Sequence, residues 1–114
     1  MESSNWPVDW LRGVLAAAVL SIVSEGETYG YLVAQRLLDA GLGVVKGGTL
    51  YPLLTRLEQD GDVVSTWREG RGGPGRKYYS ITPAGRERLT VLRTDWRLFT
   101  DRATAVITGG KADS

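Results

Sequence analysis

One change of pattern along this 114-residue chain limits its fold more than any other feature. Up to about residue 60, apolar residues recur at steps of three and four, which is the spacing of amphipathic helices. The segments 63–68 and 76–82 are instead rich in Val, Trp, Tyr, Ile and Thr, which favour strands. The loop between them, EGRGGPG, is rich in Gly and carries Arg71. The pattern therefore predicts three short helices followed by a β-hairpin.

The three helices are predicted from the apolar spacing and from the residues at their ends. They are expected from about Asp9 to near Gly26, from Thr28 or Tyr29 to Ala40, and from about Thr49 to Asp60. Gly41 and Gly61 follow the second and third helices, and glycine is the commonest residue directly after a helix. A short loop that contains Gly43, Gly47 and Gly48 joins these two helices.

The third helix is predicted to have two unlike faces. Its apolar face carries Leu50, Leu53, Leu54 and Leu57. Its opposite face carries Thr49, Tyr51, Thr55, Arg56 and Gln59. Pro52 is expected in the first turn, where its missing N–H costs little because that position has no intrahelical partner. Core packing does not require the polar face, which is therefore a candidate binding surface.

A longer helix is predicted after the hairpin. Thr82 is a typical N-cap, Pro83 suits the first helical position, and the helix is expected to run to Ile107. Its apolar residues recur at steps of 3, 4, 3, 4 and 3, as in a coiled coil: Leu89, Leu92, Trp96, Phe99, Ala103 and Val106. Such a helix is oversized for covering a two-stranded hairpin, so we expect it to form a homodimer interface.

Together these segments predict a mainly α fold with a small β-hairpin, namely a winged helix-turn-helix domain plus one long C-terminal dimerisation helix. We expect the winged helix-turn-helix domain, which would bind DNA, at residues 1–82. The dimerisation helix is expected at residues 83–108, and residues 109–114 are expected to be a disordered tail.

The composition argues against an enzyme and against a metal or cofactor site. The chain has no Cys and no His, which excludes thiol nucleophiles, Cys/His zinc sites and Ser-His catalysis. Residues 70–75 match the G-x-G-x-x-G pattern, but a strand follows them where a dinucleotide site needs a helix. The carboxylate pairs Glu58 with Asp62 and Asp95 with Asp101 are expected to be solvated. We therefore predict no cofactor.

Charge and hydropathy favour a soluble, cytoplasmic protein with a basic surface. The net charge is only +1, but residues 46–93 carry nine basic and five acidic residues. A basic segment of this kind is typical of nucleic-acid binding and also of ordinary solvated surfaces. The most apolar stretch, residues 13–23, is about half the length that spans a bilayer, so no membrane partner is expected.

Two helices joined by a Gly-containing turn, then a hairpin with a basic tip, form the winged-helix arrangement that binds double-stranded DNA. Each candidate contact also has a structural alternative. Tyr51 could be a core aromatic, and Arg56 could be a solvated cation rather than a phosphate contact. Arg76 and Lys77 could serve only to protect an edge strand. Arg71, at the loop tip, has little other structural use.

Three blocks of the sequence are distinctive: residues 48–61 read GTLYPLLTRLEQDG, residues 76–85 read RKYYSITPAG, and residues 29–31 read YGY. In these blocks the sequence resembles the PadR family of transcriptional regulators. The single C-terminal helix resembles the short subgroup of that family. One departure is Asp62, which follows Gly61 where the family usually has an apolar residue.

The resemblance implies a dimeric repressor that binds promoters and is released by a small molecule or a stress signal. A dimer of this kind is expected to bind an inverted-repeat operator with half-sites about one helical turn apart. The DNA-binding residues that it implies are Tyr29, Lys46, Thr49, Tyr51, Pro52, Arg56, Arg71, Arg76 and Lys77. Some members of the short subgroup bind flat aromatic compounds against a Trp. Trp96 occupies a matching place here, with Phe99 and Trp10 as candidate neighbours for a small aromatic effector. The alternative is that Trp96 only anchors the dimer core.

Two functions therefore remain open from the sequence. The first is a dimeric repressor that binds a specific DNA sequence. The second is a winged-helix scaffold for protein interaction or ligand sensing, without specific DNA binding, which the low net charge would allow. Weak, salt-insensitive DNA binding would distinguish the second from the first.

Overall fold

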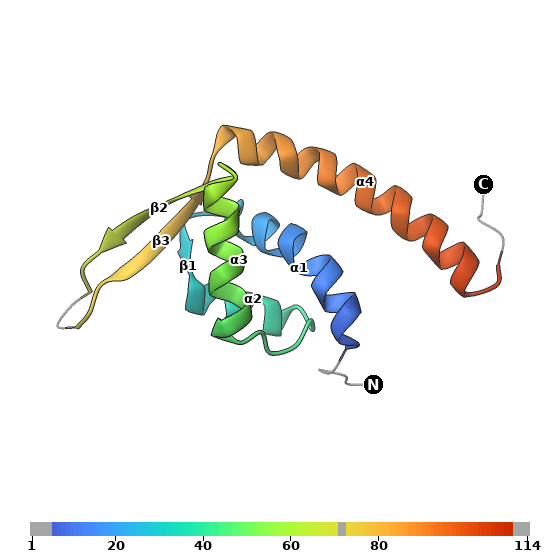
Figure 1. Ribbon diagram of the computed structural model, residues 1–114, viewed down its shortest axis with the longest axis horizontal. Helices are drawn as coiled ribbons and strands as arrows, with labels where there is room; N and C mark the ends of the chain where they lie inside the picture. The colour runs from blue at the N-terminus through green and yellow to red at the C-terminus, as the bar shows by residue number, and fades with distance from the viewer. Residues whose placement is uncertain (1–5, 71–72, 111–114) are drawn as a thin grey trace.

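Four helices and three short strands make up the described part of the chain, residues 6–70 and 73–110 of a computed structural model (Figure 1). They are α1 (Val8–Val23), β1 (Thr28–Tyr29), α2 (Gly30–Asp39), α3 (Gly47–Gln59), β2 (Val63–Arg68), β3 (Arg76–Ile81) and α4 (Pro83–Ile107). No helix in these two ranges is long and apolar enough to cross a membrane. The predicted winged-helix architecture with one long C-terminal helix is confirmed.

The core lies where the first three helices meet the base of the sheet. The largest fully enclosed side chains are Val19, Leu20, Val23, Val33, Leu37, Leu50, Leu54 and Val63. On α2 and α3 these residues lie four positions apart, and on α1 Val19 and Leu20 lie four and three positions before Val23, so one stripe of each helix turns inward. Each buried Leu or Val stabilises the fold by roughly 1.5–3 kcal/mol through loss of apolar contact with water. The buried leucines of α3 thus determine which face of that helix is exposed to solvent.

The sheet has three strands, where the sequence predicted two. Its order is β1-β3-β2, and both pairs are antiparallel. β1 adds only Thr28 and Tyr29, which lie opposite Tyr79 and Tyr78 of β3. These two residues were expected to begin the second helix, which instead starts at Gly30. A two-residue strand has no period of its own, and only its pairing with β3 gives it an extended conformation.

The prediction that Pro52 lies in the first turn of α3 is wrong. The helix begins at Gly47, two residues earlier than expected, so Pro52 is inside it, in the second turn. There its ring nitrogen cannot donate to the Gly48 carbonyl four residues before it. The rest of the helix continues to Gln59, because its leucine face is held by the core.

The start of α4 is fixed against the turn that follows α3. As predicted, Thr82 caps the helix, with its hydroxyl accepting from the Gly85 N–H at 2.9 Å and Pro83 in the first turn. The same hydroxyl donates to the Gly61 carbonyl at 2.6 Å. A Cβ on Gly85 would collide with the Asp62 carbonyl, so glycine permits this close approach. The direction of α4 is thereby coupled to the end of α3.

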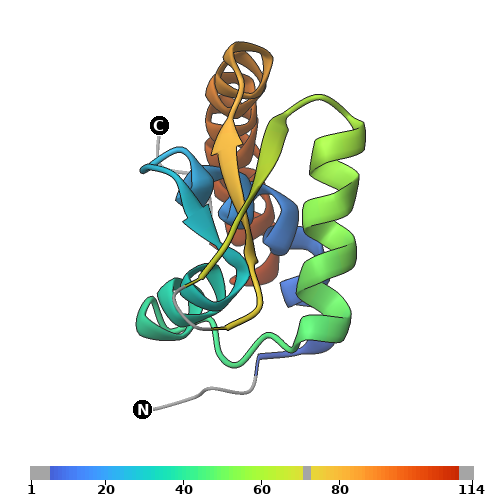
Figure 2. The same cartoon turned by 90° about the vertical axis from the view of Figure 1, so that its left-hand side faces the viewer.

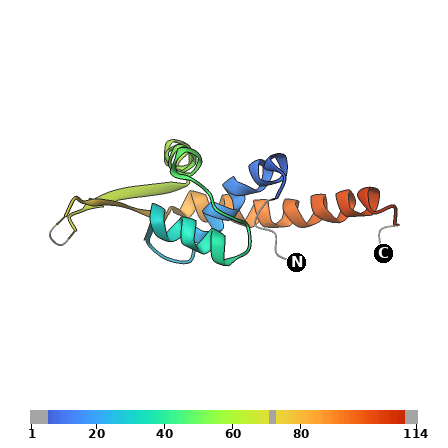
Figure 3. The ribbon, with the colours of Figure 1, turned by 90° about the horizontal axis from the view of Figure 1, so that it is seen from below.

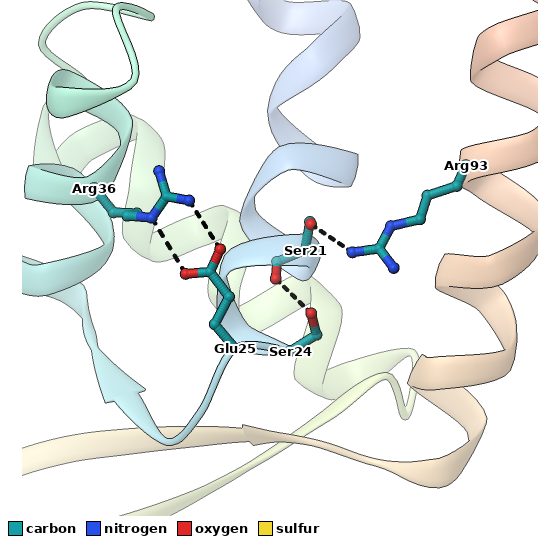
Figure 4. A network of polar contacts seen from close by, with 5 residues as sticks. All are labelled: Ser21, Ser24, Glu25, Arg36 and Arg93. Atoms are coloured by element: carbon teal, nitrogen blue, oxygen red, sulfur yellow. Dashed lines mark hydrogen bonds and ion pairs between the residues drawn. The ribbon is translucent and has the colours of Figure 1, made fainter.

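Beyond its first turns, α4 extends away from the rest of the protein (Figures 1 and 3). Leu89 is buried in the core of its own chain, and Leu92 packs against that core. Figure 4 shows a polar contact that joins α4 to α1, where Arg93 donates to the Ser21 hydroxyl at 2.9 Å. On the other side of the same network, Arg36 of α2 makes a bidentate pair with Glu25 at 2.9 and 3.2 Å. The second half of α4 is mostly exposed.

Candidate nucleic-acid interface

The exposed face of α3 carries the residues predicted from the sequence to contact DNA. Thr49, Tyr51, Pro52 and Arg56 are all exposed, while Leu50, Leu54 and Leu57 are buried on the opposite side. Figure 2 shows α3 standing beside the β2–β3 hairpin, with the N-terminal end of α3 near α2. Lys46, directly before α3, is also exposed. The end of α3 that begins with Lys46 is therefore polar, basic and free of core packing along its outer face.

Tyr51 is neither a core residue nor free of contacts. Its side chain is 50% exposed, and its ring lies over the backbone of Gly30, the first residue of α2. A Cβ at Gly30 would overlap the Tyr51 ring, so the ring occupies the space that any larger residue would need. The two helices of the helix-turn-helix thus meet at this pair. The contact fixes the orientation of the Tyr51 phenol and leaves about half of the residue's surface exposed to solvent.

The outer face of the sheet carries alternating tyrosine and arginine side chains. Arg76 lies over the Tyr29 ring at 4.5 Å, and the Tyr29 and Tyr78 rings meet edge to face at 5.2 Å. Arg68 lies over Tyr78 at 5.0 Å and pairs with Glu27 at 2.8 Å. These cation–π contacts tie the hairpin, hereafter the wing, to the start of α2. Arg68 and Tyr78 were not predicted as site residues, since only strand pairing brings them beside Arg76 and Tyr29.

The inner face of the wing is joined to α3 by Glu58. Its carboxylate accepts from the Ser65 hydroxyl at 2.6 Å and lies 3.6 Å from the Lys77 ammonium. Burial raises the pKa of the neighbouring Tyr79 phenol above its usual value of 10.0, and the nearby Glu58 carboxylate adds to the shift. Lys77 therefore has an anionic partner within the protein. Asp62, which was expected to be solvated, is instead buried in the turn after α3 and pairs with Arg88, so Glu58 and Asp62 are engaged with different cations.

A groove of about 510 Å³ lies between α1 and α3. Its walls are mainly apolar, with Leu11, Leu15 and Leu53 among them, and Lys46 and Arg56 lie at its edge. None of the ion pairs among residues 6–70 and 73–110 includes Lys46 or Arg56. Both cations are therefore available to an anionic partner. The predicted contact Arg71 lies outside the described residues.

The residues predicted to form a dimer surface and an effector site fall into two separate groups. On α4, the rings of Trp96 and Phe99 lie 6.2 Å apart. On α1, Trp10 stacks on Trp6 at 6.4 Å. No aromatic contact joins these two pairs in the part of the chain that the structure describes. Leu89, predicted at the dimer surface, is 4% exposed and packs inside its own chain.

The same residue ranges contain no group of three or more carboxylates that could hold a metal ion. The geometry offers a projecting helix face, a hairpin, and the cations Lys46 and Arg56, which no ion pair in the described ranges includes. These features suit an extended polyanion. Comparison with known proteins identifies the class. The sequence model of the transcriptional regulator PadR-like family matches residues 19–91, well over half of the chain. The chain belongs to the PadR-like family. This is a family of transcriptional regulators rather than of enzymes.

Individual PadR-like relatives agree with this assignment. The transcriptional regulator Rv3488 of Mycobacterium tuberculosis is 37% identical over 103 residues, which cover 89% of this chain and 90% of that protein. A PadR family transcriptional regulator from Eggerthella lenta is 35% identical, with a TM-score of 0.80 over 88% of this chain and 87% of that one. A PadR-like regulator from Bacillus cereus is 33% identical, with a TM-score of 0.75 over 87% and 96% of the two chains.

Proposed function

We propose that this PadR-like protein represses transcription as a homodimer that binds a specific DNA sequence, with α3 in the major groove. The observation that carries the proposal is the exposed face of α3, where Thr49, Tyr51 and Arg56 lie outside the core. A helix fits the major groove, and short polar side chains at its N-terminal end reach base edges there. Lys46 and Arg56 would contact the phosphates that flank the bases.

The wing supports the same proposal. Arg76 and Arg68 lie on its outer face, each stacked on a tyrosine, so their guanidinium groups are held in fixed directions while part of each remains solvated. A cation held in this way loses little conformational entropy when it meets a phosphate. Tyr29 precedes α2 and lies beneath Arg76, which puts it beside the proposed backbone contacts.

Dimerisation is proposed through α4. Phe99 is 64% exposed and Val106 is 81% exposed, and Trp96 lies between Leu92 and Phe99 on the same heptad stripe. Leaving this stripe in water is unfavourable, and a second copy of the helix would cover it. Leu92, Trp96, Phe99, Ala103 and Val106 form the proposed dimer surface. Because Leu89 is enclosed within its own chain, it contributes to positioning α4 rather than to this surface.

A two-fold dimer presents two copies of α3 and therefore reads an inverted repeat. The half-sites would lie about one helical turn, roughly 34–36 Å, apart along the duplex. A dimer bound across a promoter blocks the polymerase, which is the simplest form of repression. Release by a small molecule would follow if the compound changed the spacing of the two α3 helices.

A flat aromatic effector is proposed for the α4 surface, because the Trp96 and Phe99 rings are 6.2 Å apart and tilted by 44°. Trp10 stacks on Trp6 and makes no ring contact with that pair within its own chain. Trp10 would therefore join the effector site only from the partner protomer. The competing role, in which Trp96 anchors the dimer core without any effector, uses the same exposed ring.

The second candidate function is a winged-helix scaffold that does not bind specific DNA. The observation in its favour is the pairing of the wing cations with acids of the same chain, Arg68 with Glu27 and Lys77 with Glu58. Each pair weakens the positive field of the wing. The groove between α1 and α3 offers such a scaffold an apolar surface for a ligand or a protein partner.

One titration separates the two functions. Wild type and Tyr51→Ala are compared for binding to a duplex that the wild-type protein enriches from a random-sequence library, at several salt concentrations. We expect tight, salt-dependent binding by wild type and loss of sequence preference in Tyr51→Ala, with the dimer unchanged. Binding that is micromolar, equal for scrambled DNA and unaffected by Tyr51→Ala would instead support the scaffold.

A further inference from the structure

The wing carries a large apolar side chain that the protein leaves mostly exposed to water. Trp67, on the outer half of β2, is 69% exposed. Burial of an indole removes more apolar area from water than burial of almost any other side chain. An indole exposed at the end of a projecting hairpin therefore gives up this stabilising free energy. Figures 1 and 3 show the hairpin extending well past the helices, so the helices of the same chain do not cover its outer end.

Strand register places Trp67 on the same side of the wing as α3. Trp67 lies opposite Lys77, and side chains on a strand alternate between faces, so it shares its face with Ser65. Ser65 and Lys77 both contact Glu58 of α3. The other face carries the arginine and tyrosine stack of Arg76 and Tyr29. Trp67 therefore extends the wing face that begins at α3.

One edge of the indole lies close to the backbone of Gly75, the residue before β3. A Cβ at Gly75 would lie 3.1 and 3.3 Å from Cε3 and Cζ3 of the Trp67 ring and 2.9 Å from the Arg68 carbonyl oxygen. Glycine at this position lets the indole lie close to the chain just before β3. One edge of the ring therefore lies against the chain, and most of the indole surface stays exposed for a partner.

We propose that Trp67 is an apolar DNA contact of the wing, with its indole packed against deoxyribose and base edges in the minor groove next to the major groove occupied by α3. The proposal rests on the DNA-binding function proposed above. Proteins that enter the minor groove commonly combine an apolar wedge with neighbouring cations. Trp67 supplies the wedge, and Lys77 across from it supplies a cation if its partly exposed ammonium exchanges Glu58 for a phosphate. The contact would read groove width and base-step deformability rather than base identity.

The test uses the duplex enriched by wild type and compares salt dependence among variants. Trp67→Ala is expected to bind about ten-fold more weakly with an unchanged salt slope, because an apolar contact releases no counterions. Trp67→Phe should retain most of the affinity. Lys77→Gln should lower the salt slope instead. Val64→Ala is the matched control, since Val64 is an exposed apolar residue of the same strand on the opposite face.

Tryptophan emission gives a second, independent readout. Adding the duplex to wild type should change the emission, and this change should be largely lost in Trp67→Phe, which isolates the signal of the one indole. Wild-type affinity in Trp67→Ala, or an equal emission change in Trp67→Phe, would overturn the proposal while leaving DNA binding intact. Failure of wild type to enrich any duplex would overturn the proposed function itself, and this inference with it.

Discussion

The Nε atom of Arg88, near the start of α4, lies 3.2 Å from Oδ2 of Asp62, in the turn after α3. The Asp62 side chain is 6% exposed, and in the described residues Oδ2 accepts no well-directed hydrogen bond. The ion pair is therefore the contact that compensates this buried charge. It links the end of the proposed DNA-reading helix to the start of the proposed dimerisation helix.

Removing the cation is expected to destabilise the fold. Arg88→Gln would leave the Asp62 carboxylate enclosed without a partner, at a cost of about 1–2 kcal/mol in the free energy of unfolding. This cost in free energy is smaller than for a fully buried ion pair, because the Arg88 side chain is itself 54% exposed. The double variant Asp62→Val with Arg88→Gln should recover much of the loss, because no buried charge remains. Urea unfolding followed by circular dichroism measures both, and wild-type stability of Arg88→Gln would refute the argument.

Gly30 gives a way to move Tyr51 without deleting it. In Gly30→Ala the new Cβ would meet the far end of the Tyr51 ring, which would have to swing outward. We expect the stability to change by no more than about 1 kcal/mol, because the backbone need not move. Affinity for the enriched duplex should nevertheless fall about ten-fold, because the Tyr51 phenol is displaced from its present orientation. DNA titration and thermal unfolding of the same sample separate the two effects.

The control for this variant is Gly13→Ala in α1, where a Cβ would meet nothing within 4 Å. It should stabilise the protein by roughly 0.5–1 kcal/mol through helix propensity alone and leave DNA binding unchanged. Unchanged DNA binding in Gly30→Ala as well would show that the direction of Tyr51 is unimportant.

The elements of the fold that could be predicted from the sequence are those that depend on residues close together in the chain. The leucine spacing of α3, the Thr82 cap with Pro83 and the alternation of the strands each depend on residues close in the chain. β1 was missed because Thr28 and Tyr29 are extended only through their partners on β3, about 50 residues later. Pro52 was misplaced because two glycines, weak helix formers, begin α3.

The residues of the candidate DNA-binding site also fall into those that local sequence patterns predict and those that only the tertiary structure reveals. The polar face of α3 follows from helical periodicity, so Thr49, Tyr51 and Arg56 could be selected from the sequence. The role of Trp67 could not, because its face is set by its register with Lys77 and by the contact of Lys77 with Glu58. The Asp62 pair with Arg88 spans two elements and likewise needs the tertiary structure.

Arg56 should contribute one phosphate contact to DNA binding. It lies on the exposed face of α3, and no ion pair in the described ranges includes it. Arg56→Gln is therefore expected to lower the slope of log affinity against log salt by about 0.9, the effect of one phosphate contact. Arg12→Gln is the control, because Arg12 pairs with Asp9 on α1 at 3.3 Å. Equal slopes for wild type and Arg56→Gln would remove Arg56 from the interface.

Phe99 should be essential to the proposed dimer. Phe99→Ser removes the most exposed aromatic ring of α4 and is expected to weaken association by about 2–4 kcal/mol, as for an aromatic anchor at an interface. Analytical ultracentrifugation over a dilution series should then show a monomer where wild type is a dimer. Asp101→Ala, an exposed residue of the same helix, should leave the dimer intact. A wild type that is monomeric at all concentrations would contradict the dimer proposal directly.

Tyr79 should make the stability sensitive to alkaline pH. Because burial and the Glu58 carboxylate raise the pKa of its phenol in the folded protein, the folded state keeps its proton at a pH where the unfolded chain has begun to lose it. Its contribution is therefore complete below about pH 10 and declines as the pH rises toward the folded-state pKa. Tyr79→Phe cannot ionise, so its free energy of unfolding should fall less between about pH 8 and about pH 11. Tyr31→Phe, an exposed tyrosine on α2, is the control, and parallel declines in wild type and Tyr79→Phe would show that Tyr79 is not the responsible group.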